Sequence, residues 1–141
     1  MRRARLILMV LGIAATSSGC RLLSASDDVV LVSGTVRCDN GQPVTQGQVG
    51  LYQGEAPPLA FCLQGCRWTN PAVLAEQRLT DGRFELALAL NDDAVPENLW
   101  ILAAADGELC GAGYNFEQRA LVLAPDDRHM VLEIVIAPFF T

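Results

Sequence analysis

The chain has no lysine and a single histidine, His129. It also has no apolar run longer than about ten residues, whereas a helix that spans a bilayer needs about twenty. All ten basic residues are arginines, and sixteen acidic residues outnumber them, giving a formal net charge of −6. An acidic chain does not suit nucleic acid, whose phosphates attract basic patches. These shortages argue against a nucleic-acid partner and a transmembrane anchor, and they leave little material for imidazole chemistry.

The first twenty residues have the layout of a secretory signal. Arg2, Arg3 and Arg5 precede an uncharged apolar stretch over residues 6–15, and small polar residues lead to Cys20. This arrangement resembles the bacterial lipoprotein signal, which implies removal of residues 1–19 and acylation of Cys20. Plain secretion is the alternative, because cleavage after small residues could also use Thr16 with Ser18 or Ser24 with Ser26.

The number of cysteines favours the lipoprotein interpretation. The chain has five cysteines, and an odd number leaves one thiol without a partner in an oxidising compartment. With Cys20 carrying lipid, four remain, and two disulfides are common in small exported domains with limited cores. These four cysteines are Cys38, Cys62, Cys66 and Cys110.

Three segments follow from this interpretation: a signal peptide over residues 1–19, a lipid-anchored tether over 20–28 and one domain over 29–141. Removal of the signal takes away three of the ten arginines and no acidic residue, which leaves seven positive against sixteen negative charges, or −9. Such a chain is not attracted to anionic headgroups by charge. Membrane association would therefore depend on the lipid at Cys20.

Seven segments of the domain have the character of strands. Apolar residues alternate with polar ones in the first and last segments, and Asp81-Gly82 and Asp106-Gly107 each stand between two segments as hairpin turns. The expected strands cover residues 29–38, 48–53, 74–80, 83–90, 99–105, 108–116 and 129–137. The pattern predicts an all-β, seven-stranded antiparallel sandwich of the immunoglobulin-like or transthyretin-like kind. Residues 71–78 could instead form one or two helical turns.

Several short motifs resemble the carboxypeptidase regulatory-like domain. They are Val32-Ser33-Gly34-Thr35-Val36, Gly41-Gln42-Pro43-Val44, Gly47-Gln48-Val49 and Thr80-Asp81-Gly82-Arg83-Phe84. The resemblance covers residues 30–90 and implies a transthyretin-like sandwich of the type found in bacterial surface proteins. Transthyretin-like relatives that hydrolyse a purine-derived ring use several histidines, which this chain lacks. The motifs describe turns and imply a fold without an activity.

We expect no catalytic residue, metal or cofactor. His129 lies on the outward side of the last expected strand, and no local signature places Ser33 or a cysteine beside it. The four cysteines lack the paired short spacings of a zinc site. The acidic pairs Asp27-Asp28, Asp92-Asp93 and Asp126-Asp127 lack the ligand spacing of a calcium loop.

The favoured disulfides are Cys38 with Cys110 and Cys62 with Cys66. Cys38 has inward parity, and in the predicted hairpin Ala103 lies opposite Cys110, which points Cys110 toward the core. Two other arrangements remain open, Cys38–Cys62 with Cys66–Cys110 and Cys38–Cys66 with Cys62–Cys110. A redox role for Cys62 and Cys66 is the functional alternative, although three residues rather than two lie between them.

The sequence therefore favours a non-enzymatic binding or assembly module on the bacterial cell envelope. It would be held through Cys20 on the cell membrane or outer membrane, facing the periplasm or the exterior. The longest irregular segment, the loop over residues 54–71, follows the second expected strand. Aromatic residues are enriched at interface hot spots, so this long loop, with the end of the strand before it, is the candidate contact surface for an unknown protein or glycan. Its candidate residues are Tyr52, Phe61, Trp68 and Asn70. The alternatives are an enzyme centred on the Cys62–Cys66 loop and a secreted soluble binding domain.

Overall fold

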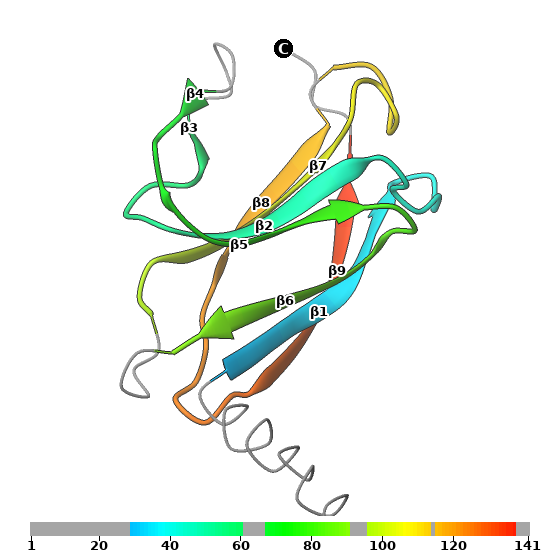
Figure 1. Cartoon of the computed structure of the whole chain (residues 1–141). Coiled ribbons are helices and arrows are strands. Elements are labelled where there is room, and N and C mark those ends of the chain that lie inside the picture. The colour runs from blue at the N-terminus through cyan, green and yellow to red at the C-terminus, as the bar shows by residue number, and fades with distance from the viewer. Residues whose placement is uncertain (1–28, 61–66, 91–95, 114, 138–141) are drawn as a thin grey trace, which may run out of the picture.

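The computed structural model describes residues 29–60, 67–90, 96–113 and 115–137, which form strands and connecting turns. The strands are β1 (Val29–Cys38), β2 (Gly47–Gln53), β3 (Leu59–Ala60), β4 (Arg67–Trp68), β5 (Ala72–Leu79), β6 (Arg83–Ala89), β7 (Leu99–Ala105), β8 (Phe116–Leu121) and β9 (His129–Ile136) (Figure 1). The all-β prediction is confirmed. Six of the seven expected strands are present, the strand expected over 108–116 is replaced by β8, and β3 and β4 add a short pair between β2 and β5.

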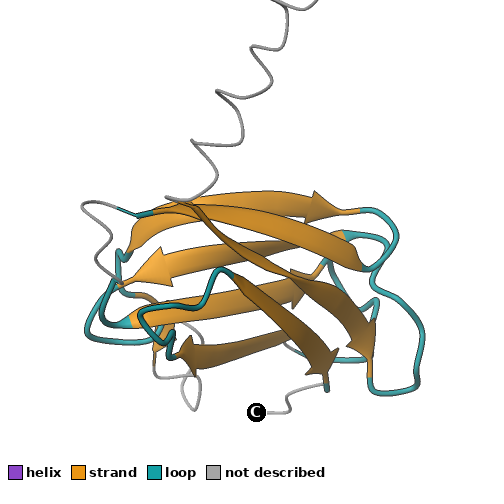
Figure 2. Ribbon diagram, turned by 90° about the horizontal axis from the view of Figure 1, so that it is seen from below, coloured by secondary structure: helices purple, strands orange, loops and turns teal. Residues whose placement is uncertain are grey.

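Two sheets lie face to face, as Figure 2 shows. One has the strand order β6-β1-β9 and the other the order β5-β2-β7-β8, while β3 and β4 pair separately. Alternation produces this packing: Phe84, Leu86 and Leu88 of β6 are buried, and the residues between them are exposed. Side chains from both sheets meet in one core, which includes Val32, Leu51, Ile101 and Ile134.

One strand pair departs from the expected antiparallel arrangement. β9 runs parallel to β1, with Gly34 beside Leu132 and Cys38 beside Ile136. The strands can run in the same direction because β8 and β9 belong to different sheets, so residues 122–128 cross from one layer to the other. The backbones approach closely at Gly34, where a Cβ would lie 1.8 Å from the carbonyl oxygen of Leu132. The glycine is therefore required by close packing.

The expected hairpin around Asp81-Gly82 is wrong. β5 and β6 lie in different sheets, and the turn carries the chain from one layer to the other. The Gln77 side chain of β5 replaces some of the backbone hydrogen bonds that a β5–β6 hairpin would have made. Its nitrogen donates to the Arg83 carbonyl (3.2 Å), and its oxygen accepts from the Glu85 amide (3.0 Å). An Asp-Gly pair signals a turn without specifying the sheet that receives the next strand. Residues 71–78 contain no helical turn, because β5 occupies most of them.

The second predicted hairpin is correct in its pairing and wrong in its length. β7 and β8 are antiparallel neighbours, with Ala103 opposite Glu117. β8 begins only at Phe116, so Cys110 lies in the connection rather than on a strand. Gly107, Gly111 and Gly113 all have positive φ angles, which give the connection turns that an extended strand cannot make.

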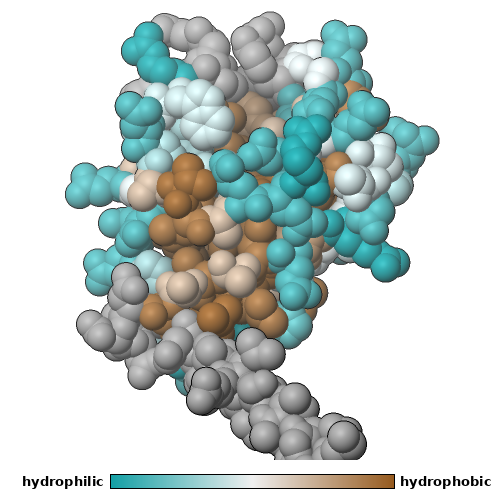
Figure 3. Space-filling model, viewed as in Figure 1, coloured by the Kyte–Doolittle hydropathy of each residue, from teal (hydrophilic) through white to brown (hydrophobic). Residues whose placement is uncertain are grey.

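The surface carries apolar side chains near the beginning of β1. Figure 3 shows them gathered over the end of β6 and the beginning of β1, with hydrophilic side chains to either side. On β9, Val131 is 72% exposed, and the outward position of His129 is confirmed. Part of the outer face of the three-stranded sheet is therefore apolar and open to solvent.

Replacement of Gly34 by alanine tests the close approach of β1 and β9. We expect Gly34→Ala to lower the free energy of unfolding by about 3 kcal/mol or more, because the Cβ meets backbone that has to move. Gly107→Ala is the control, since a Cβ there meets nothing within 4 Å, although its φ of 53° adds a small cost. Equal effects of the two changes in urea unfolding would contradict the close approach.

Candidate functional site

The outer face of the four-stranded sheet carries large side chains that point away from the core. Tyr52 lies opposite Trp100, and Gly50 lies opposite Leu102. Outward residues of a two-layer sandwich normally meet solvent, yet Tyr52 and Leu102 are each only 4% exposed. A third layer must therefore cover this face.

That layer is the segment between β2 and β5, here called the arm, which comprises described residues 54–60 and 67–71. In Figure 1 the arm rises from the end of β2 and carries the β3–β4 pair. Pro58 is fully buried, and Ala60 is 7% exposed. The arm thus gives the outer face of the sheet its own small apolar layer.

Hydrogen bonds fix the arm to the sheet. The Gln118 side-chain oxygen accepts from the Leu59 amide (2.9 Å), and its nitrogen donates to the Leu59 carbonyl. A carboxamide has the same donor and acceptor as a peptide group, so Gln118 acts toward the arm as a neighbouring strand would. The Trp100 indole also donates to the Gly54 carbonyl (3.0 Å). These contacts hold the arm at two separate points.

The two sides of the arm are also bonded to each other. The Thr69 hydroxyl donates to the Pro57 carbonyl (2.9 Å), and the Thr69 amide donates to the Pro58 carbonyl (3.2 Å). Asn70 then takes a left-handed conformation with φ 55°, which asparagine tolerates better than most residues, and Pro71 follows. The role that the structure gives Asn70 is to turn the chain out of the arm and into β5.

Tyr52 forms the floor beneath the arm. Its ring crosses Gly50, where a Cβ would lie 2.8 Å from the tyrosine oxygen, so glycine makes room for the ring. Its hydroxyl donates to a Glu76 carboxylate oxygen (3.3 Å). Burial, and then the negative charge of Glu76, raise the pKa of Tyr52 to about 12. At neutral pH this side chain is a protonated, buried support.

Trp68 lies against this support and remains 56% exposed. Its ring centroid is 6.1 Å from that of Tyr52, with an interplanar angle of 52°, within the range of tilted aromatic contacts. Val73, opposite Tyr52 on β5, is also 56% exposed. Trp68 and Val73 therefore present an apolar surface on a buried base.

The structure brings together part of the predicted contact surface. Tyr52 and Trp68 are in contact, and Tyr52 is the buried partner rather than an exposed one. Asn70 is exposed, two residues after Trp68. Phe61 lies outside the described residues. Sequence reasoning missed Trp100, which alternation along β7 could have placed on the same face, and Gln118, for which the sequence offered no signal.

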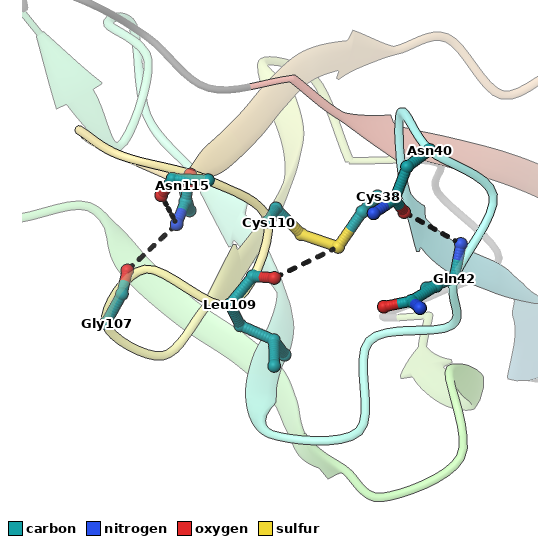
Figure 4. The surroundings of a disulfide bond; sticks show 8 residues. Cys38, Asn40, Gln42, Gly107, Leu109, Cys110 and Asn115 are labelled. Atoms are coloured by element: carbon teal, nitrogen blue, oxygen red, sulfur yellow. Dashed lines mark hydrogen bonds between the residues drawn. A yellow bond between two sulfur atoms is a disulfide. The ribbon is translucent and has the colours of Figure 1, made fainter.

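A disulfide between Cys38 and Cys110 confirms one predicted pair. The two Cα atoms are 5.1 Å apart, and both residues are nearly fully buried. Cys110 reaches Cys38 from the turn after β7, where the Asn115 side chain donates to the carbonyls of Gly107 and Gly111 (2.9 Å each) (Figure 4). The hairpin argument that placed Cys110 opposite Ala103 was therefore wrong, although the pairing is right. Cys62, Cys66 and Cys20, the expected lipid site, lie outside the described residues.

Ser33 and His129 meet on the outer face of the three-stranded sheet, contrary to the sequence analysis. The Ser33 hydroxyl oxygen lies 2.9 Å from His129 Nε2. The parallel pairing of β1 and β9 brings the two residues together from positions 96 apart in the chain. The imidazole makes no other hydrogen bond within the described residues, so the pair lacks the third group that orients the base in a catalytic triad.

No metal-binding group of three or more histidine, cysteine or acidic side chains occurs among the residues that the structure describes. Of the three acidic pairs considered for calcium, only Asp126-Asp127 is described. The Asp127 carboxylate accepts from the Ala124 amide (2.8 Å), which closes the turn before β9. Nor does any helix in the described ranges have the length and apolar character of a membrane span. The absence of a metal or cofactor stays a prediction.

No protein-family model and no curated protein matches the chain. Among solved structures, a 5-hydroxyisourate hydrolase of Klebsiella pneumoniae is 15% identical, with a TM-score of 0.44, and the match covers 79% of this chain and 92% of that one. An (S)-allantoin synthase is 17% identical, with a TM-score of 0.47, covering 86% of this chain and 46% of that one. A 9R-lipoxygenase from Cyanothece PCC8801 is 10% identical, with a TM-score of 0.42, covering 79% and 17%.

All three TM-scores lie below 0.5, so the all-β fold is established by the strands of this chain and not by these likenesses. The expectation of a non-enzymatic protein is corrected to this extent: two of the similar structures, a 5-hydroxyisourate hydrolase and an (S)-allantoin synthase, are enzymes. At 15% and 17% identity, neither their substrates nor their reactions transfer to this chain.

The raised pKa of Tyr52 predicts a stability change at alkaline pH. In the unfolded chain Tyr52 ionises near its ordinary pKa of 10.0, whereas in the fold it ionises near 12. Its contribution to stability is therefore fully present below pH 10 and is lost as the pH rises through about 12. We expect the free energy of unfolding of the wild type to fall more steeply over this range than that of Tyr52→Phe. Parallel slopes in urea unfolding at several pH values would show that the hydroxyl is not held protonated.

Proposed function

We propose that the chain is a lipoprotein of the bacterial cell envelope, anchored through Cys20, whose sandwich is a binding module. The signal-like residues 1–19 and the cysteine before the tether support the anchor. The buried Cys38–Cys110 disulfide supports export, because such bonds persist in oxidising compartments. The anchor would hold the domain on the cell membrane or outer membrane, facing the periplasm or the exterior. The turn motifs support a carboxypeptidase regulatory-like domain as the finer assignment.

The binding surface that we propose consists of Trp68, which packs on Tyr52, and Val73, which lies next to Tyr52 on β5. The observation that carries the proposal is that Trp68 is 56% exposed while it lies on Tyr52, which is 4% exposed. Tyr52 shows that this face can bury an aromatic ring. The exposure of the Trp68 ring beside it therefore favours a partner that covers Trp68. The bonds from Gln118, Trp100 and Thr69 fix the arm before a partner arrives, which lowers the ordering cost of association. A protein or a glycan presenting an apolar face would fit this surface.

Partner capture from the native membrane tests the surface. We expect Trp68→Ala to weaken capture of a crosslinked partner by tenfold or more, since a central aromatic anchor typically contributes 2 kcal/mol or more. Leu109→Ala is the matched control, because Leu109 is an exposed apolar residue in the turn near the disulfide. Equal capture by the wild type and Trp68→Ala, with both chains folded by circular dichroism, would reject Trp68 as the contact residue.

A further inference from the structure

The outer face of the three-stranded sheet changes character along the strands. Beside the beginning of β1 most of the aligned outward residues are apolar: Val29 lies next to Ala89, and Leu31 lies between Ala87 and the exposed His129. Val131 of β9 lies next to Ser33 of β1 and is 72% exposed. We name these five apolar residues, Val29, Leu31, Ala87, Ala89 and Val131, the tether-end face.

Most of the charged residues of the same face lie farther along the strands, although Val135, beside Arg37, is apolar. Arg37 forms an ion pair with Glu133 (2.7 Å), and Arg83 and Glu85 are exposed on β6. The change from apolar to charged occurs within the length of β1, and the two parts share one sheet surface. Solvent exposure alone does not account for this division, because both parts are open to water.

The apolar part lies where the domain joins its proposed anchor. Nine residues, 20–28, separate the start of the chain after signal removal from Val29. At no more than about 3.6 Å per residue, this segment can place Val29 at most about 32 Å from the lipid. Leu31 is the third residue of β1, and Val131 is the third residue of β9, the parallel neighbour of β1. A protein anchored through Cys20 therefore keeps the tether-end face within reach of the bilayer surface.

We propose that the tether-end face lies against the membrane that holds the anchor, in contact with the headgroup and upper acyl region. This inference rests on the proposed function, because it requires lipid on Cys20. The contact would be apolar rather than electrostatic, since the chain without its signal carries a balance of −9 and has no lysine. Asp126 and Asp127, in the turn just before β9, disfavour anionic headgroups at this end.

This orientation would leave the arm available to a partner. The arm covers the outer face of the four-stranded sheet, whereas the tether-end face belongs to the three-stranded sheet on the other side of the sandwich (Figure 1). With the tether-end face on the bilayer, Trp68 is directed away from the membrane surface. The same lipid contact would thus restrict the tilt of the domain and present the proposed binding surface outward.

Spin labels on the acylated full-length chain test the contact in vesicles of phosphatidylethanolamine and phosphatidylcholine. A nitroxide is placed at Val131→Cys and, as the matched control, at Val73→Cys, an exposed valine of the other sheet. The wild-type chain, treated identically, gives the background from native cysteines. We expect the label at 131 to be relaxed at least threefold more by lipid-soluble oxygen than by a water-soluble nickel chelate. The label at 73 should show the reverse, and added phosphatidylglycerol should weaken the effect at 131.

Three results would contradict the proposal in different ways. An acylated chain whose two labels are equally open to the water-soluble chelate would overturn this inference and leave the proposed function intact. A label at 131 shielded from both relaxants would mean that a second copy or another protein covers the face, which also overturns the lipid contact. A chain without lipid by mass spectrometry would overturn the anchor and this inference together.

Discussion

The disulfide between Cys38 and Cys110 is the constraint on which the two-layer structure depends. Cys38 ends β1 in the three-stranded sheet, and Cys110 lies in the turn that connects two strands of the other sheet. The bond therefore joins the layers covalently across 72 positions of sequence, and loop-closure entropy makes it worth about 4 kcal/mol. For a domain of this size that is a large share of a typical net stability. A reducing compartment would remove this contribution, so the fold has its full stability only where the bond can persist.

Alternation allowed much of the sandwich to be predicted, because strands with one buried face show their period directly in the sequence. β1, β6 and β9 were placed within a residue or two. Sheet membership could not be predicted, since the Asp81-Gly82 turn has the same local chemistry whether the chain folds back in one sheet or crosses to the other. The parallel pairing of β1 and β9 depends on that crossing and was missed with it. Cys38–Cys110 was paired correctly by a hairpin argument that the longer turn invalidates.

The candidate site was less predictable than the sandwich, because local sequence does not determine which distant segments come together. Tyr52 and Trp68 could be chosen as aromatic residues near one loop, but the burial of Tyr52 depends on an arm folded over the outer face of the sheet. Gln118 holds that arm through contacts between residues 59 positions apart, and no local pattern reports such a contact. The meeting of Ser33 with His129 likewise requires the register of two distant strands. The side-chain contacts that the sequence did not reveal are those between residues far apart in the chain, because they depend on how distant strands align.

The tether-end face and the proposed binding surface lie on opposite sides of one disulfide-linked sandwich, which would give an anchored molecule a direction with respect to the membrane. The central claim is that Cys20 carries lipid while Cys38 and Cys110 are bonded to each other. Mass spectrometry of the mature chain from its own membrane, without reduction, tests it most directly. The account predicts an N-terminal Cys20 bearing a diacylglyceryl group and a linked peptide pair containing Cys38 and Cys110. A chain with unmodified Cys20, or with free thiols at Cys38 and Cys110, would contradict it.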